Sequence, residues 1–211
     1  LPNGKLLQVN IYAIDGTPLV SIHDLMLVAA DALLKEEHKV IRLGPPQTQG
    51  SHFNFIAHSE PRRAPGENDV EIEVKAAGLN FKDVLIALGV IPSPEDKSMT
   101  FGQEASGVIT RLGSGVTHFK VGDRVMAAGH SCFAEHVLMP ASVVAKIPPT
   151  IGYTQAATIP VAFTTAWIAL VKTANLKRGE RILIHSAASG VGMAAMQIAQ
   201  YLGAEVWATA G

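Results

Sequence analysis

The clearest hydrophobic pattern in the chain is a strict alternation over residues 70–75, which reads VEIEVK. Its apolar side chains fall on one face and its charges on the other, as in a half-buried β-strand. Short apolar segments separated by breaks such as GSG, KVGD and MPA recur at 107–112, 124–127, 133–139 and 143–147. The region from 40 to 147 is therefore predicted to consist mostly of short strands.

Two apolar runs near the start of the chain flank Asp15-Gly16, a dipeptide that favours a tight hairpin turn. Residues 6–14 and 19–29 are predicted to be the two strands of one hairpin, and 29–38 a helix or linker. A lone two-stranded hairpin is marginal in water. These strands are therefore expected to complete a sheet whose other strands precede Leu1.

A short helix is predicted after the alternating strand. Asn80 is a good N-cap residue, Asp83 would lie in the first turn, and Gly89 would end the helix. Four side chains would form its apolar face: Phe81, Val84, Leu85 and Leu88.

After Pro148-Pro149 the pattern changes to alternating helices and strands. A helical stretch begins at Thr154, is broken at Pro160 and resumes over 162–176. A strand at 181–185, a helix at 191–202 and a second strand at 205–210 then form a unit of the parallel strand-helix-strand kind. Only two strands of a sheet that normally has about six are present, so the chain is expected to contain part of a larger domain.

The turn between that strand and helix carries the chemical signal. Gly190, Gly192 and Ala195 satisfy G-x-G-x-x-A. In this arrangement the glycines let the backbone approach a pyrophosphate at a helix N-terminus, and the small third residue allows close helix-strand packing. The flanking elements raise this motif above a bare glycine triplet, and dinucleotide binding is predicted. The alternative is a tight turn that binds no ligand.

The expected cofactor is NADPH rather than NADH. In NAD-binding versions of this unit, an acidic residue about 20 positions after the first glycine receives the ribose hydroxyls. Here that count reaches Ala210, and the nearby acid, Glu205, lies at the beginning of the strand. No carboxylate would therefore repel a 2′-phosphate.

Composition excludes several other classes of protein. Of 211 residues, 48% are hydrophobic and 17% charged, with a formal charge of −1, which argues against a nucleic-acid partner. One cysteine allows no intrachain disulfide and no multi-cysteine zinc cage, so a reducing, cytoplasmic location is expected. No apolar run in the sequence reaches the ~18–20 residues of a membrane span, and no membrane partner is expected.

Five segments occur in a recognisable order: AGLNFKDVL at 77–85, FGQEASG at 101–107, VGDRV at 121–125, AFTTAW at 162–167 and HSAASGVGMAA at 185–195. Together they resemble the enoyl reductase domain of type I modular polyketide synthases, in the zinc-free, quinone-oxidoreductase-like branch of the medium-chain dehydrogenase/reductase superfamily. The preceding hairpin and linker, 1–38, look like the end of a dehydratase domain.

The resemblance implies an α/β plus mostly β architecture. Residues 39–149 would be the GroES-like substrate domain, and 150–211 the first, incomplete part of an inserted Rossmann-like NADPH-binding domain. NADPH would deliver hydride to the β-carbon of an α,β-unsaturated acyl thioester held on an acyl carrier protein, and the α-carbon would then be protonated. The resemblance also implies contacts with other domains of the same synthase, and a homodimer.

The resemblance also assigns roles to individual residues. Asn80 and Thr165 would line the nicotinamide end of the cofactor. The pyrophosphate would be bound by Ala187, Ala188, Ser189, Gly190, Val191 and Gly192. The lysine and aspartate proposed as proton donors in the family are expected after Gly211, so no catalytic residue is assigned.

One position departs from many members of the family. Where they carry a tyrosine just before a proline, this chain has Ile91, which cannot donate a proton. By analogy, an α-methyl product would have the opposite configuration to that of the tyrosine-bearing enzymes. Intramolecular capture of the enolate in place of protonation also stays open.

A catalytic zinc ion is not expected. The alcohol-dehydrogenase branch binds zinc through cysteine, the histidine of Gly-His-Glu and a second cysteine. This chain has Asn80 at the first position and Gly102-Gln103-Glu104 at the second, and Cys132 is the only thiol. The segment 129–133 resembles a nucleophile elbow but ends in Phe133 instead of glycine.

Three alternatives remain open. Asn80 could simply cap its helix, which does not exclude contact with nicotinamide. The protein could be a free-standing NADPH-dependent quinone or enone reductase. It could also be a catalytically silent scaffold domain that binds NADPH.

Overall fold

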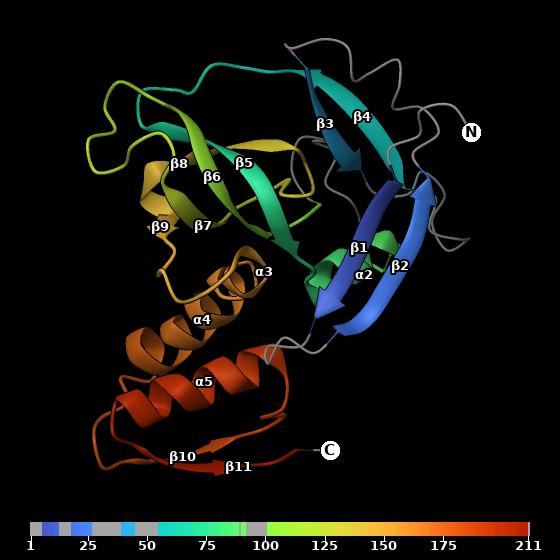
Figure 1. Cartoon of the computed structure of the whole chain (residues 1–211). Helices are drawn as coiled ribbons and strands as arrows, with labels where there is room; N and C mark the ends of the chain where they lie inside the picture. The colour runs from blue at the N-terminus through green and yellow to red at the C-terminus, as the bar shows by residue number, and fades with distance from the viewer. Residues whose placement is uncertain are drawn as a thin grey trace. The chain divides into compact units, whose positions relative to one another are not determined.

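The computed structural model describes residues 6–12, 18–26, 39–44, 55–88, 90–91 and 101–210. The chain divides into two compact units, Leu1–Ala157 and Thr158–Gly211 (Figure 1). The predicted turn at Asp15-Gly16, the helix or linker at 29–38 and the helix end at Gly89 lie outside the described residues.

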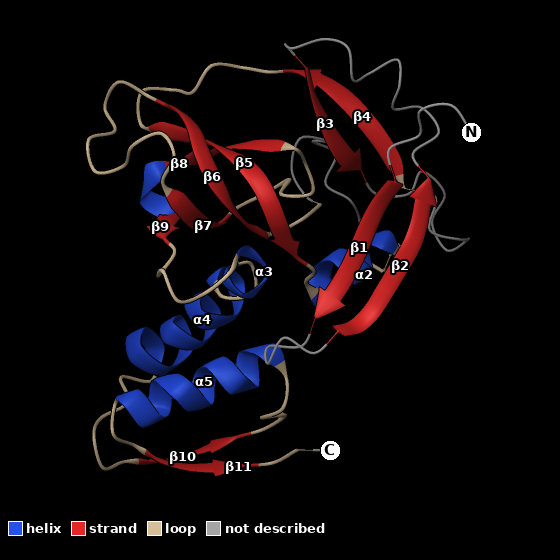
Figure 2. Ribbon diagram, viewed as in Figure 1, coloured by secondary structure: helices blue, strands red, loops and turns tan. Residues whose placement is uncertain are grey.

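The first unit contains a five-stranded antiparallel sheet with strand order β8-β5-β6-β7-β9 (Figure 2). Its strands are β5 Asp69–Gly78, β6 Glu104–Leu112, β7 Arg124–Ala128, β8 His136–Pro140 and β9 Val144–Lys146. The prediction of short strands over this region is confirmed.

The alternation that predicted β5 is only partly reflected in burial. Val70 and Ile72 are fully buried in the core of the sheet, as expected, but Glu71 on the opposite face is also buried, with 1% exposure. The carboxylate of Glu71 accepts hydrogen bonds from Arg62, Arg111 and Thr110. Burial by itself raises the pKa of Glu71, but these three donors outweigh it and hold the pKa at about 2.

Two antiparallel strand pairs precede this sheet in the sequence. β1 Leu6–Tyr12 pairs with β2 Pro18–Met26, which confirms the predicted hairpin. β3 Lys39–Gly44 pairs with β4 Ile56–Pro61. Backbone hydrogen bonds join β3 to the segment before β8, from Leu43 N to Phe133 O (2.8 Å) and from Glu135 N to Ile41 O (3.0 Å).

The helix α2, Phe81–Ala87, forms where it was predicted, but it buries a different face. Its buried residues are Asp83, Ile86 and Ala87, whereas Phe81 is 75% exposed. The predicted apolar face is therefore wrong. The cause is Asp83, whose carboxylate is drawn inward by backbone N–H groups on either side of it in sequence.

Two short helical segments follow the sheet. α3, Tyr153–Ala156, belongs to the first unit. The second unit begins with α4, Pro160–Trp167, and its continuation η2, a π-helical turn over Ile168–Thr173. Pro160 begins α4 because a proline in the first helical turn loses no hydrogen bond.

The second unit then forms the predicted strand-helix-strand arrangement. β10 Arg181–Ile184 and β11 Glu205–Ala208 are parallel and connected by α5, Gly190–Tyr201. Small side chains on α4 and α5, among them Ala166, Ala194 and Ala199, are at most 1% exposed in the core between these helices.

Among the described residues, one helical stretch satisfies the length and composition of a membrane span, although it is interrupted by polar side chains. It covers Tyr153–Thr173, 21 residues of mean hydropathy 1.3. A core helix of a soluble protein passes the same test, so a single such stretch is weak evidence. Part of its apolar character is accounted for by α4 and η2, which contribute Ala166 and Leu170 to the core of the second unit.

Candidate functional site

The turn between β10 and α5 is held to the end of β11 by backbone hydrogen bonds. Ala187 N donates to Thr209 O (2.9 Å), and Thr209 N donates to Ile184 O (3.0 Å). Ser186 has a φ of 52°, which turns the chain sharply out of the strand. The N-terminus of α5 therefore lies at the carboxyl end of two parallel strands, the usual ligand-binding edge of such a sheet.

The two glycines of the motif have different surroundings. A Cβ on Gly192 would collide with Ser186 O and stand 2.8 Å from Ala187 Cα, so only glycine allows the helix to approach the turn this closely. A Cβ on Gly190 would meet no atom within 4 Å. The absence of a side chain at Gly190 therefore leaves open space, which suits the close approach of a ligand.

Ser189 begins α5 as its N-cap. Its Oγ accepts a hydrogen bond from Gly192 N (3.1 Å). The other N–H groups of a first helical turn have no acceptor within the helix, and together with the helix dipole they favour an anion. Ala187, Ala188, Gly190 and Val191 surround this helix end, so the six residues predicted for the pyrophosphate occupy one continuous turn.

Thr165 lies on α4 in the same unit. It is exposed, whereas its neighbour Ala166 is buried against α5. The side chain of Thr165 is thus free of the core and open to a ligand.

Asn80 lies in the first unit, between β5 and α2. Its backbone N–H donates to Asp83 Oδ2 (2.9 Å), which closes the start of the helix. Its side-chain Nδ2 donates to Glu104 Oε1 (3.0 Å), on β6. The amide nitrogen of Asn80 is therefore directed at a carboxylate from another element, beyond any role of Asn80 in capping α2.

The carboxylates beside Asn80 are both buried. Asp83 accepts a second backbone hydrogen bond, from Gly102 N to Oδ1 (2.9 Å). Burial raises the pKa of Asp83, and the N–H donors of Asn80 and Gly102 oppose that rise. Glu104 is 4% exposed and is packed so closely against Gly78 that a Cβ there would overlap the carboxylate.

The side chains at the two zinc-ligand positions do not suit zinc. Asn80 and Gln103 carry amides, and Gln103 Nε2 is a buried donor with no hydrogen-bond partner among the described residues. Burial, followed by the charges of Glu104 and Asp83, raises the pKa of Cys132 to about 12, so its thiol stays protonated at neutral pH. Within the described ranges, no three His, Cys, Asp or Glu side chains gather as a metal site.

The segment 129–133 does not form a nucleophile elbow. Ser131 and Cys132 are both buried, and the segment lies in a loop before β8. Neither the high pKa of the thiol nor the loop provides an activated nucleophile.

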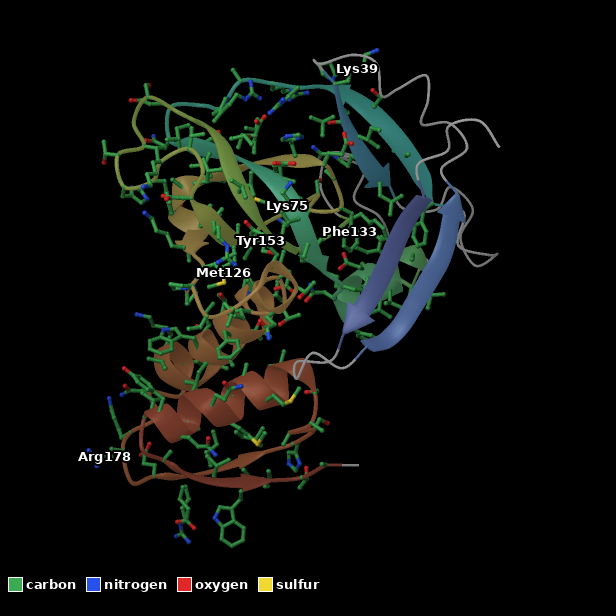
Figure 3. The ribbon with its side chains drawn as sticks, in the orientation of Figure 1. Lys39, Lys75, Met126, Phe133, Tyr153 and Arg178 are labelled. Carbon is green, nitrogen blue, oxygen red and sulfur yellow. The ribbon has the colours of Figure 1, made fainter. Side chains whose placement is uncertain are left out.

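Ile91 lies against an apolar cluster in the first unit. Ile86, Ala87 and Phe101 form the buried part of this cluster, and Phe133, labelled in Figure 3, packs at its side. The rings of Phe101 and Phe133 meet edge to face, with centroids 5.0 Å apart. Ile91 therefore contributes apolar surface and no proton donor.

Reasoning from the sequence missed the carboxylates around Asn80. Glu104 was noted only as part of a segment that lacks a zinc histidine, and Asp83 only as a helix residue. The hydrogen bond between Asn80 and Glu104 joins residues 24 apart in the sequence, and no local pattern predicts such a contact.

Residues 66–149 match the family model of the alcohol dehydrogenase GroES-like domain. The structure is similar to that of an Escherichia coli quinone oxidoreductase complexed with NADPH, with a TM-score of 0.67 and 34% identity, covering 82% of this chain and 52% of that one. The chain therefore has the GroES-like fold of the medium-chain dehydrogenase/reductase oxidoreductases, which confirms the predicted fold class.

Within that class the similarity is to polyketide synthases. The chain is 48% identical over 143 residues to a highly reducing polyketide synthase of Didymella fabae, a match that spans 68% of this chain and 7% of the relative. The structure of the CurK enoyl reductase matches with a TM-score of 0.75 and 38% identity, over 82% of this chain and 54% of that one. The chain is a homologue of polyketide synthases with the fold of their enoyl reductases, and the predicted resemblance is confirmed.

Proposed function

We propose that the chain is part of an NADPH-dependent enoyl reductase of a polyketide synthase. The observation that carries the proposal is the turn from Ala187 to Gly192. It presents a capped helix N-terminus and open space at Gly190, in a chain homologous to polyketide synthases. The pyrophosphate of the cofactor would bind this turn, and Asn80 and Thr165 would each contact its nicotinamide end.

The reaction proposed is the reduction of an α,β-unsaturated acyl thioester carried by an acyl carrier protein. When bound, NADPH supplies a hydride to the β-carbon and leaves as NADP⁺. The electron pair of the double bond moves toward the thioester oxygen, and the resulting enolate takes a proton at the α-carbon. Ile91 lies in apolar surroundings, so the proton has to come from another group.

The preference for NADPH is supported by the end of β11. Thr209 and Ala210 follow this strand, and neither carries a charge that would repel a 2′-phosphate. Glu205 lies at the opposite end of β11, where its carboxylate accepts a hydrogen bond from Trp207 Nε1 (2.9 Å).

The domain organisation belongs to the same proposal. Residues 1–38 would end a dehydratase-like domain, 39–149 would be the substrate domain, and 150–211 would begin the NADPH-binding domain. Acyl carrier protein, other domains of the synthase and a second copy of the reductase would be the partners, in the cytoplasm.

The test uses the full parent polypeptide, incubated with NADPH and a crotonyl thioester of pantetheine. We expect NADPH oxidation and butyryl thioester, detected by absorbance and mass spectrometry, with NADH as a poorer donor. A butyryl thioester, which has no double bond to reduce, is the matched control. Tight NADPH binding without turnover would instead indicate a silent scaffold, and preference for a quinone would indicate a quinone reductase.

A further inference from the structure

The buried carboxylate of Glu104 has no assigned role in the proposed function. It is 4% exposed, and it accepts a hydrogen bond from the amide of Asn80 over 3.0 Å. Asn80 is itself only partly buried. Glu104, a buried acceptor on β6, thus binds the amide of Asn80, and part of the Asn80 surface remains exposed.

The chemistry of this pair fixes which atom Asn80 presents. An ionised carboxylate can only accept hydrogen bonds, whereas an amide has a donating nitrogen and an accepting oxygen. The Asn80 amide therefore has to turn Nδ2 toward Glu104, which makes Oδ1 the amide atom that can accept a hydrogen bond from another group. A rotation that exchanged the two atoms would bring two oxygens together.

The surroundings keep Glu104 in place. Gly78 leaves room for the carboxylate that a Cβ would fill. The start of α2 is closed by Asp83, which accepts from the backbone N–H of Asn80. The hydrogen bond from Asn80 to Glu104 is thus separate from the one that closes the helix.

We propose that Glu104 is a positioning residue that orients the Asn80 amide so that Oδ1 accepts a hydrogen bond from the nicotinamide half of the cofactor. This inference rests on the proposed function, because it takes NADPH as the ligand at Asn80. The donor is neutral and is either the carboxamide N–H of nicotinamide or a hydroxyl of its ribose. Glu104 acts through Asn80 and does not touch the cofactor.

A double-mutant cycle in the full parent polypeptide tests this inference. The variants are Asn80→Ala, Glu104→Gln and the two combined, and the readout is the Kd for NADPH measured by its fluorescence. Loss of one neutral hydrogen bond should raise Kd about fivefold in Asn80→Ala. The amide of Glu104→Gln can donate as well as accept, so it frees the Asn80 amide to face either way and should raise Kd about twofold. Because Glu104 acts only through Asn80, the double variant should bind as Asn80→Ala does.

Two outcomes overturn the inference. Either Glu104→Gln leaves Kd unchanged, or the effects of the two substitutions multiply in the double variant. Glu73→Gln, at a half-exposed glutamate on β5, is the matched control and should leave Kd unchanged. Asn80→Ala removes a side chain that is not fully buried, so its Kd tests the contact between Asn80 and the cofactor even if Glu104→Gln lowers stability.

A cofactor analogue identifies the donor. 3-Acetylpyridine-NADP⁺ keeps the carbonyl of NADP⁺ but lacks the carboxamide N–H. If the carboxamide is the donor, the native protein should prefer NADP⁺ over the analogue several-fold. Asn80→Ala should lose that preference, and Glu104→Gln should reduce it. If a ribose hydroxyl is the donor, both variants should weaken the two cofactors equally.

Failure of the proposed function can be distinguished from failure of the role given to Glu104. A native protein that binds no NADPH overturns both proposals. A native protein that binds and oxidises NADPH, with a Glu104→Gln variant indistinguishable from it, overturns only the role of Glu104.

Discussion

Every buried polar or charged side chain among the described residues lies in Leu1–Ala157, namely Glu71, Asp83, Glu104, Ser106 and Ser131. The buried cluster of Thr158–Gly211 contains alanine, leucine and isoleucine side chains. In the first unit, the candidate site residue Asn80 is a side chain hydrogen-bonded to a buried carboxylate. In the second unit, the candidate site is the backbone of a turn, whose shape depends on small residues and close packing.

The largest effect expected from this difference is at Glu71. Glu71→Gln would leave the guanidinium groups of Arg62 and Arg111 without their counter-charge and should lower the free energy of unfolding of the first unit by about 3 kcal/mol. Hydrogen exchange of β5 and β6 measures this loss, and exchange of β10 and β11 should not change. Glu73→Gln, on the same strand but 41% exposed, should cost less than about 1 kcal/mol. Equal effects of the two substitutions would contradict the distinction.

Lowering the pH should destabilise the first unit through the same residue, Glu71. The folded-state pKa of Glu71, about 2, lies below its ordinary value of 4.5. The resulting stability, about 3 kcal/mol, is complete above pH 4.5 and is lost as the pH falls toward 2. Exchange of β5 measured against pH should show this loss in the native protein and not in Glu71→Gln. Parallel pH curves for the two proteins would overturn the assignment to Glu71.

The raised pKa of Asp83 acts in the opposite direction. Its protonation is favoured by the folded state, so the stability that it contributes increases as the pH falls through its folded-state pKa toward the ordinary value of 3.8. Asp83→Asn removes the stability gained by protonating Asp83. Comparing the pH dependence of stability of Asp83→Asn with that of the native protein therefore separates the contribution of Asp83 from that of Glu71.

In the second unit, the paired variants Gly192→Ala and Gly190→Ala should act on different properties. Gly192→Ala forces a methyl group against Ser186 and Ala187 and should cost about 2 kcal/mol of stability as well as cofactor affinity. Gly190→Ala meets no atom, so it should leave stability intact and raise the NADPH Kd about tenfold by occupying the space proposed for the ligand. Unchanged NADPH binding by folded Gly190→Ala would contradict the role given to that space.

The smallest effect is expected at the helix cap. Ser189→Ala removes the acceptor of the Gly192 N–H and should cost about 1 kcal/mol of stability. Ser189→Asp keeps an acceptor but adds a negative charge, so it should retain stability and weaken NADPH binding. Thermal unfolding and NADPH titration of the two variants separate capping from cofactor binding. Weaker NADPH binding by Ser189→Ala than by Ser189→Asp would contradict this separation.

Local patterns predicted those parts of the fold that local physics determines. The alternation over 70–75, the hairpin of β1 and β2 and the order β10-α5-β11 all follow from hydrophobic period and turn residues. The glycine turn was predicted from its motif because its geometry depends on residues close together in the sequence.

Long-range polar contacts explain where those patterns failed. The charge pattern predicted Glu71 on an exposed face, but Arg111, 40 positions away, covers it. The helical pattern predicted Phe81 toward the core, but Asp83 turns inward to the N–H of Gly102, 19 positions away. The partner of Asn80 was missed for the same reason. The residues around a carboxylate in the sequence do not reveal which distant group will donate a hydrogen bond to it.

The burial of Cys132 gives the protein an intrinsic reporter. It is the single cysteine of the chain, fully buried, with a pKa of about 12. An alkylating reagent that requires thiolate is therefore excluded in the folded state and reacts only when the region around Asp83 and Glu104 opens. The rate of labelling at this one sulfur would report how often the surroundings of Asn80 open, without any engineered probe.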